Sequence, residues 1–115
     1  MITIKNRDDL DKMRFAGRVA ADALSFLTPF VKPGVTTLEI DRKAEMFIRS
    51  KGCTPAFLGY QNFPYTICAS VNKQAVHCKP SNYVLQNGDV FKIDIGAIND
   101  GFYSDTAKTF IVGEA

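Results

Sequence analysis

The stretch "KIDIGAINDGFYSDTAKTF", residues 92–110, places two aspartates in a run that otherwise favours β-strands. Asp100-Gly101 stands between two alternating segments, which is a strong short-range signal for a hairpin with a two-residue loop. Such a loop puts Asp94 and Asp105 on one face of the sheet as diagonal neighbours, about 7–8 Å apart at the backbone. A three-residue loop would put them on opposite faces, because side chains alternate along a strand. We therefore predict a two-residue loop and two carboxylates able to share a metal ion.

The surroundings of Asp94 strengthen this expectation. The opposite face of its strand is apolar and should anchor the hairpin on a core: Phe91, Ile93, Ile95 and Ala97. An unpaired buried carboxylate costs several kcal/mol, so a cation should accompany Asp94 in a polar cleft. Gly96 has no side chain and should leave room for that ion. The alternative is that both aspartates are ordinary solvated positions on a soluble hairpin.

Composition limits the other classes of protein. At 115 residues with 46% hydrophobic content, the chain has the size of one compact domain. Its 14 basic and 12 acidic residues are scattered, which does not favour nucleic acid as a partner. No run approaches the roughly 20 apolar residues of a membrane span, and no N-terminal apolar leader is present, so we expect a cytoplasmic location. The odd number of cysteines, without a CxxC pair, indicates reduced thiols at Cys53, Cys68 and Cys78.

Start and stop signals predict two helices, at about residues 7–28 and 37–51. Asn6 with Asp9 resembles an N-cap, and Thr36 with Glu39 resembles a capping box. Two apolar stripes follow these signals: Leu10, Met13, Gly17, Ala20, Leu24 and Leu27 in the first helix, and Leu38, Ala44, Phe47 and Ile48 in the second.

The rest of the chain, about residues 57–112, should form the sheet on which both helices lie. The expected strands are residues 66–71, a short piece near Val76, residues 83–85 and the hairpin over residues 89–112. Helices followed by strands predict an α+β fold with a mainly antiparallel sheet.

Four stretches of the sequence resemble the type I methionine aminopeptidases, which are cytosolic metallopeptidases of the pita-bread (creatinase/aminopeptidase-like) fold. They are "MRFAGRVAAD", "FLGYQNFPYTICASVN", "AVHCKP" and "GDVFKIDIGAINDGFYSDTAKTF". The resemblance runs along nearly all of the chain. It implies that residues 1–115 form the N-terminal half of a pita-bread catalytic domain.

The resemblance also implies roles for particular residues. Asp94 and Asp105 match metal ligands of the family, and His77 matches a histidine that contacts the substrate and assists proton transfer. A lone histidine is more often structural, and the family match is what raises His77 to a catalytic and substrate-binding candidate. After His77 this chain has Cys78 and Lys79, where the family commonly has HGIP.

Further positions match the substrate pocket. Tyr60, Phe63 and Cys68 fall where the family lines the pocket for the methionine side chain, although aromatic residues at such spacing are usually core. Asn72 matches a position near a monovalent-cation site in some members.

The implied reaction is removal of the initiator methionine from new polypeptides whose second residue is small. Its partners would be the N-termini of nascent chains, met at the ribosome. Two divalent ions of cobalt, manganese, iron or zinc would activate water and polarise the scissile carbonyl. Two such ions carry four positive charges and the two aspartates two negative ones, so further carboxylates are needed. In the family a C-terminal half supplies a histidine and two glutamates.

We therefore interpret the sequence as a fragment or truncated form, inactive as an isolated chain. Two alternatives remain open from the sequence. One is a proline-specific pita-bread peptidase, and the other is a non-catalytic peptide-binding or interaction module of the same fold.

Overall fold

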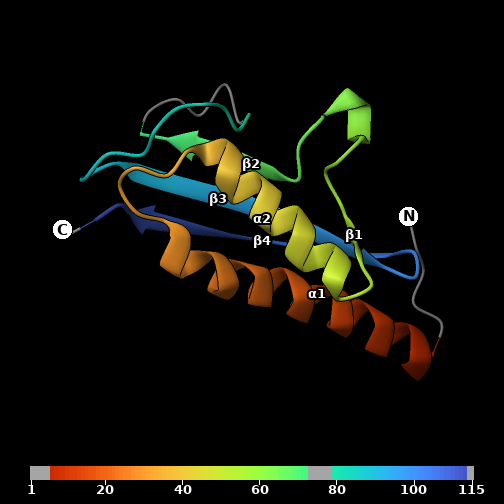
Figure 1. Cartoon of the computed structure of the whole chain (residues 1–115). Helices are drawn as coiled ribbons and strands as arrows, with labels where there is room; N and C mark the ends of the chain where they lie inside the picture. The colour runs from red at the N-terminus through yellow and green to blue at the C-terminus, as the bar shows by residue number, and fades with distance from the viewer. Residues whose placement is uncertain (1–5, 73–78, 114–115) are drawn as a thin grey trace.

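The structure is a computed structural model that describes residues 6–72 and 79–113. These residues form two α-helices and a four-stranded antiparallel sheet, which confirms the predicted α+β class (Figure 1). The helices are α1 (Arg7–Leu27) and α2 (Thr37–Ser50), and the strands are β1 (Thr54–Pro55), β2 (Ile67–Val71), β3 (Val90–Asn99) and β4 (Phe102–Ile111). Short 3₁₀ turns lie at Thr28–Phe30 and Tyr60–Asn62.

Strand β3 is the centre of the sheet. It pairs with β4 along one edge and with β1 and β2 along the other, all antiparallel. In the β3–β4 hairpin Asn99 pairs with Phe102, so the loop has the two predicted residues. Asp100 and Gly101 have φ values of 50° and 86°, the positive pair that a type I′ turn requires. The loop length that decides which face each aspartate occupies is therefore confirmed.

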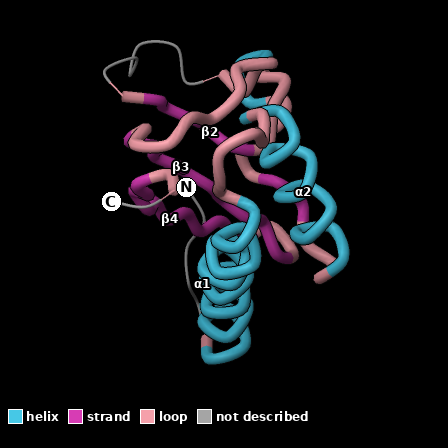
Figure 2. The backbone as a smooth tube through the Cα atoms, turned by 60° about the vertical axis from the view of Figure 1, so that its left-hand side comes forward, coloured by secondary structure: helices cyan, strands magenta, loops and turns pink. Residues whose placement is uncertain are grey.

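Both helices lie on the same face of the sheet, as Figure 2 shows. Helix α1 packs on β3 and β4, and α2 packs on β1 and β2. The core lies between these two layers, and the predicted apolar face of β3 is fully buried in it. Its largest fully buried side chains include Leu27, Ile40, Ile48, Ile67, Leu85, Phe91, Ile93 and Ile95.

Side-chain caps begin both helices, as the sequence indicates. The Asn6 side chain accepts a hydrogen bond from the Asp9 amide at 2.9 Å, and the Thr36 hydroxyl accepts one from the Glu39 amide at 3.2 Å. Helix α1 ends at Leu27, where the 3₁₀ turn containing Pro29 begins. Each observed helix ends one residue before the predicted boundary.

The sheet differs from the prediction at two places. It begins at β1, before residue 57, because a two-residue strand ending in Pro55 has no alternating pattern to detect. Residues 83–85 are not a strand, since only a single bridge joins Val84 to Thr36. Their backbone polar groups pair with the turn that precedes α2 instead. The expected piece near Val76 lies outside the described residues.

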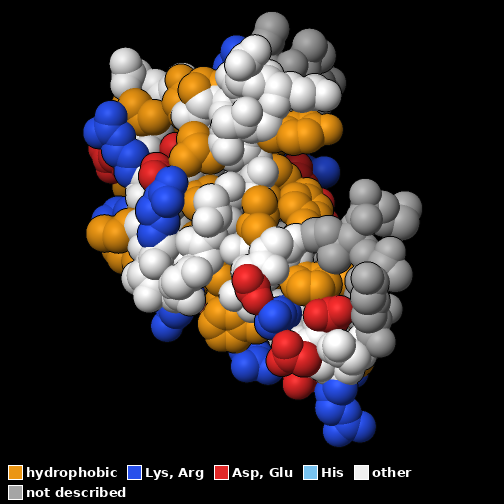
Figure 3. Space-filling view, turned by 90° about the vertical axis from the view of Figure 1, so that its right-hand side faces the viewer, with side chains coloured by type: hydrophobic (Ala, Val, Ile, Leu, Met, Phe, Trp, Pro, Cys, Tyr) orange, Lys and Arg blue, Asp and Glu red, His pale blue; other side chains and the backbone are white. Residues whose placement is uncertain are grey.

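The tip of the hairpin is attached to the beginning of α1. The Asn99 side chain donates to the Lys12 carbonyl at 3.1 Å, and the Lys12 ammonium lies 2.7 Å from Asp100 and 3.3 Å from Asp8. Figure 3 views this end of the molecule, where acidic and basic side chains lie next to one another. Exposed ion pairs contribute little each, about 0–1 kcal/mol. Together with the buried face of β3, these contacts hold the hairpin against α1.

Neither helix among the described residues has the length and apolar character needed to cross a membrane.

Candidate functional site

The candidate site lies on the face of the sheet that points away from the helices, called here the open face. Asp94 and Gly96 of β3 and Asp105 of β4 share this face, because Gly96 pairs with Asp105 and Asp94 is two residues along. Cys68 of β2 pairs with Asp94 and joins the same face. The hairpin thus brings the two aspartates together as diagonal neighbours, on the side expected from the sequence.

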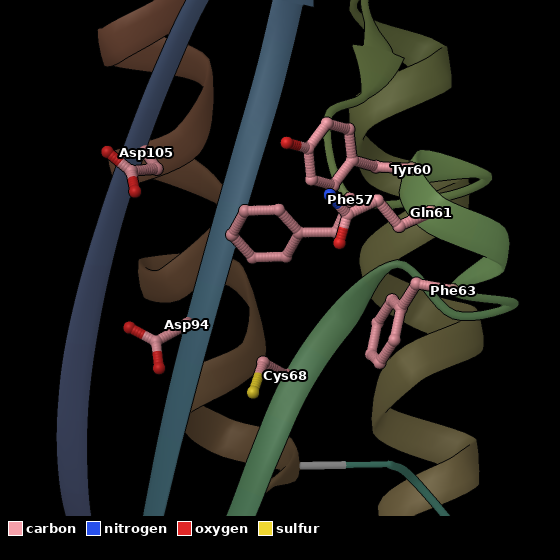
Figure 4. A pocket seen from close by; sticks show the side chains of 7 residues that line it. All are labelled: Phe57, Tyr60, Gln61, Phe63, Cys68, Asp94 and Asp105. Carbon is pink, nitrogen blue, oxygen red and sulfur yellow. The ribbon is translucent and has the colours of Figure 1, made fainter.

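A pocket of about 420 Å³ covers this part of the open face, and Figure 4 shows the side chains around it. Asp94 and Asp105 form one wall, Cys68 lies on β2, and the other side chains come from the segment of residues 56–65, called here the pocket segment. The complete lining is Phe57, Tyr60, Gln61, Phe63, Cys68, Asp94 and Asp105. Three predicted pocket residues, Tyr60, Phe63 and Cys68, therefore meet the two predicted ligands in one pocket.

The surroundings of the aspartates are more open and less polar than the sequence suggested. Asp94 is half-buried and Asp105 is exposed, so neither carboxylate is desolvated to the extent that would demand a cation. The expected polar cleft is wrong, because aromatic rings of the pocket segment face the carboxylates. Both helices lie on the other face, and no helix of the described chain covers the open face.

Gly96 has a structural contact that the sequence did not indicate. A Cβ atom at this position would lie 2.8 Å from the Ala56 Cβ, so the pocket segment packs closely against Gly96. The room for an ion beside Gly96 stays a prediction. The Ala56 amide donates to the Gly96 carbonyl at 3.0 Å. Sequence reasoning missed this contact because β1, which brings Ala56 there, was not predicted.

Tyr103 lies on the open face two residues before Asp105. Partial burial raises the pKa of the Tyr103 hydroxyl, and the negative charge and hydrogen bonding of Asp105 raise that pKa further. Tyr103 also lines a second hollow of about 440 Å³ with Tyr60 and Ile98. A tyrosine that stays protonated beside Asp105 can donate a hydrogen bond to that carboxylate.

Sequence reasoning missed two pocket residues, Phe57 and Gln61. Both lie in the quoted stretch that carries Tyr60, and an aromatic residue three positions before Tyr60 was the available signal for Phe57. Gln61 has φ 47°, which turns the chain within the pocket segment.

Asp41 of α2 is a further carboxylate that the sequence did not single out. It is buried, and one of its oxygens accepts hydrogen bonds from the amides of Thr66 and Ile67, each at 2.8 Å. Burial raises the pKa of Asp41, and these two backbone hydrogen bonds lower it only in part. Asp41 therefore anchors the beginning of β2, the strand that carries Cys68.

Asn72 occupies a turn at the other end of β2. Its side-chain oxygen accepts from the Val90 amide at 2.9 Å, and its side-chain nitrogen donates to Asp89 at 3.1 Å. These bonds connect the turn after β2 to the beginning of β3. Asn72 is not among the residues that line the pocket. His77 and Cys78 lie outside the described residues.

A metal centre fits part of this donor set. Two carboxylates on adjacent strands of one face are oxygen ligands of the kind that divalent ions bind. Among residues 6–72 and 79–113, however, no group of three or more His, Cys, Asp or Glu side chains could hold a metal ion. Asp94 and Asp105 therefore remain predicted ligands, and by themselves they are fewer than a closed metal site needs.

Comparison with known proteins identifies the family of this α+β chain. The chain belongs to metallopeptidase family M24, whose sequence profile matches residues 11–115. Within that family it is similar to methionine aminopeptidases. The one from Clostridium perfringens is 47% identical over 113 residues, which cover 98% of this chain and 45% of that protein.

Solved structures give the same result. Methionine aminopeptidase from Rickettsia prowazekii superimposes with a TM-score of 0.91 at 43% identity, covering 99% of this chain and 46% of that one. A Xaa-Pro dipeptidase from Bacillus anthracis has a TM-score of 0.80 at 27% identity, covering 96% of this chain and 30% of that one. The chain has the pita-bread fold of its family and spans less than half the length of these relatives. Membership of a metallopeptidase family implies divalent metal ions.

Proposed function

We propose that this chain is the N-terminal half of the catalytic domain of a methionine aminopeptidase, which removes the initiator methionine from nascent proteins and peptides with a small second residue. The observation that carries the proposal is the meeting of Asp94 and Asp105 with an apolar pocket large enough for one side chain. Similarity to methionine aminopeptidases at 47% and 43% identity supports it.

In this proposal Asp94 and Asp105 hold divalent ions of cobalt, manganese, iron or zinc. When bound, such ions polarise the scissile carbonyl and lower the pKa of water. The remaining ligands, a histidine and two glutamates, belong to the rest of the protein. The isolated 115-residue chain is then inactive, because two carboxylates provide neither the ligand number nor the charge for a two-metal site.

The residues of the pocket select the substrate. Phe57, Tyr60 and Phe63 surround the methionine side chain, whose flexible thioether makes favourable contacts with aromatic rings. Cys68, which pairs with Asp94, lines the same pocket. His77 contacts the substrate and assists proton transfer.

The cellular setting follows from the same function. The substrates are N-termini of nascent polypeptides, which the enzyme meets in the cytoplasm and at the ribosome. Asn72, whose side chain already binds Asp89 and Val90, contributes to a monovalent-cation site through its remaining acceptor capacity.

The test compares Asp94→Asn and Asp105→Asn with Asp100→Asn in the full-length protein. Asp100 is an exposed aspartate of the same hairpin, so its variant controls for loss of one charge. The two site variants should lose metal and release no methionine from Met-Ala-Ser, because each removes a charge and a ligand. The Asp100 variant should keep both properties.

Full activity with bound metal in either site variant would contradict the assigned ligands. The same assay separates the alternatives. Release of the first residue from Xaa-Pro peptides, and not from Met-Ala-Ser, would indicate a proline-specific peptidase. A full-length protein that binds peptide without metal would indicate a non-catalytic module.

A further inference from the structure

The pocket segment meets the central strand at Gly96. The Ala56 amide donates to the Gly96 carbonyl at 3.0 Å, which continues the pairing of Pro55 with Ala97. A Cβ atom at position 96 would lie 2.8 Å from the Ala56 Cβ and 3.2 Å from the Ser104 carbonyl oxygen. Gly96 is not among the glycines with positive φ, so its backbone suits any residue. Position 96 therefore requires glycine because a Cβ atom would clash with Ala56, and not because of its backbone conformation.

The segment that Ala56 anchors is held together by hydrogen bonds within it. The Tyr60 amide donates to the Phe57 carbonyl at 3.1 Å, the Phe63 amide to the Tyr60 carbonyl at 2.9 Å, and the Gly59 amide to the Phe63 carbonyl at 2.7 Å. These bonds close the segment on itself between Ala56 and the beginning of β2. A displacement of Ala56 should therefore also displace the aromatic rings of the pocket segment.

We propose that Gly96 is a positioning residue for the aromatic pocket. Its missing side chain lets the Ala56 methyl group pack against β3 and thereby holds Phe57, Tyr60 and Phe63 in the pocket that Asp94 and Asp105 also line. A methyl group at position 96 forces Ala56 back by about 0.6 Å to reach the 3.4 Å of an ordinary contact. The consequence for methionine selection rests on the proposed function, whereas the consequence for the shape of the pocket does not.

The experiment compares four full-length proteins: the natural one, Gly96→Ala, Ala56→Gly and the double variant. Ala56→Gly removes the methyl group that a new Cβ at position 96 would strike, so the double variant should restore the contact. Gly17→Ala is the matched control, because it also adds a methyl group without positive φ. A Cβ atom at position 17 would lie 3.2 Å from the Ser104 hydroxyl, which can rotate away. Ser104 lies on the helix-covered face, so this change does not touch the pocket.

Two readouts are measured. The first is the rate at which iodoacetamide alkylates Cys68, located by peptide mass mapping with buried Cys53 as the internal reference. It reports the shape of the pocket without requiring catalysis. The second is kcat and KM for Met-Ala-Ser together with metal content.

We expect Gly96→Ala to raise the alkylation rate of Cys68 several-fold. It should also raise KM, and kcat/KM should fall by about 10- to 100-fold, the effect of misplacing a substrate-positioning group by up to an ångström. Metal content should not change. The double variant should return both readouts toward the natural values, and Gly17→Ala should alter neither.

The proposal is overturned if Gly96→Ala behaves like the natural protein, or if the double variant is no better than Gly96→Ala. Should Gly96→Ala fail to fold, recovery of folded protein in the double variant supports the contact, and absence of recovery refutes it. A natural protein that releases no methionine refutes the proposed function, and the alkylation rates still decide the role of Gly96.

Discussion

Replacing Asp41 of α2 by alanine should destabilise the protein by several kcal/mol. The Asp41 carboxylate accepts hydrogen bonds from the amides of Thr66 and Ile67, and both of these residues are 0% exposed. Asp41→Ala leaves both buried amides without their acceptor. Each unsatisfied buried donor costs about 1–3 kcal/mol, so the loss of two acceptor contacts in Asp41→Ala should cost about 2–6 kcal/mol. The free energy of unfolding of a typical domain is only about 5–15 kcal/mol.

The assay is urea-induced unfolding followed by circular dichroism, with two companion variants. Asp41→Asn keeps an oxygen acceptor and should lose little stability. Glu45→Ala removes a carboxylate from the same helix, where Glu45 makes a solvent-accessible ion pair with Arg49, and should cost less than about 1 kcal/mol. The reasoning is refuted if Asp41→Ala is no more destabilising than Glu45→Ala.

The pH dependence gives a second check on Asp41. Burial raises its pKa in the folded state above the unfolded value of about 3.9. A raised pKa means that the stabilising contribution of Asp41 is complete below the unfolded value and is lost as pH rises through the folded one. Between pH 4 and pH 7 the stability of the natural protein should therefore fall relative to Asp41→Asn. The opposite trend would show that hydrogen bonding outweighs burial.

Four further predictions concern other parts of the chain. Thr66→Val should stabilise the protein by about 1 kcal/mol in urea unfolding, because the Thr66 hydroxyl is buried without a hydrogen-bond partner in the described structure. Burial raises the pKa of Asp89, but hydrogen bonds from the Gln86 amide and two side chains outweigh it and lower that pKa. The stabilisation by Asp89 should therefore be present above about pH 4 and lost as pH falls further, which a comparison with Asp89→Asn over pH 2–6 would measure. His77→Ala should slow methionine release about 10²-fold or more in the full-length protein while metal stays bound, and loss of metal would make His77 a ligand. Lys12→Met should change the thermal midpoint by only a degree or two, since its ion pairs are solvent-accessible, and a larger drop would show that the hairpin tip depends on them.

Much of the fold could be predicted because its signals are local. The caps at Asn6 and Thr36 and the Asp100-Gly101 turn depend on neighbouring residues, and all three are present in the structure. The position of Asp94 and Asp105 on one face followed from the length of that turn alone.

What could not be predicted depends on contacts between distant parts of the chain. The approach of Ala56 to Gly96 requires β1, which is too short to leave a pattern. Asp41 interrupts the apolar stripe of its helix, and nothing near it in sequence reveals the amides that it binds 25 and 26 residues away. The exposure of Asp105 depends on which face of the sheet is covered, and that depends on the packing of the whole domain.

The pairing pattern of β3 has a consequence for the order in which this region folds. Asp94 and Asp105 belong to one hairpin, whose two strands are joined by a loop of only two residues. Hairpins form within about 1–10 μs. The pairing of Cys68 with Asp94 and of Thr54 with Ile98 instead closes loops of tens of residues, at a greater entropic cost. The carboxylate pair should therefore form early, and the aromatic pocket should close over it afterwards. Pulsed amide exchange during refolding would show this order as protection in β3 and β4 before protection of the amides at residues 56 and 67.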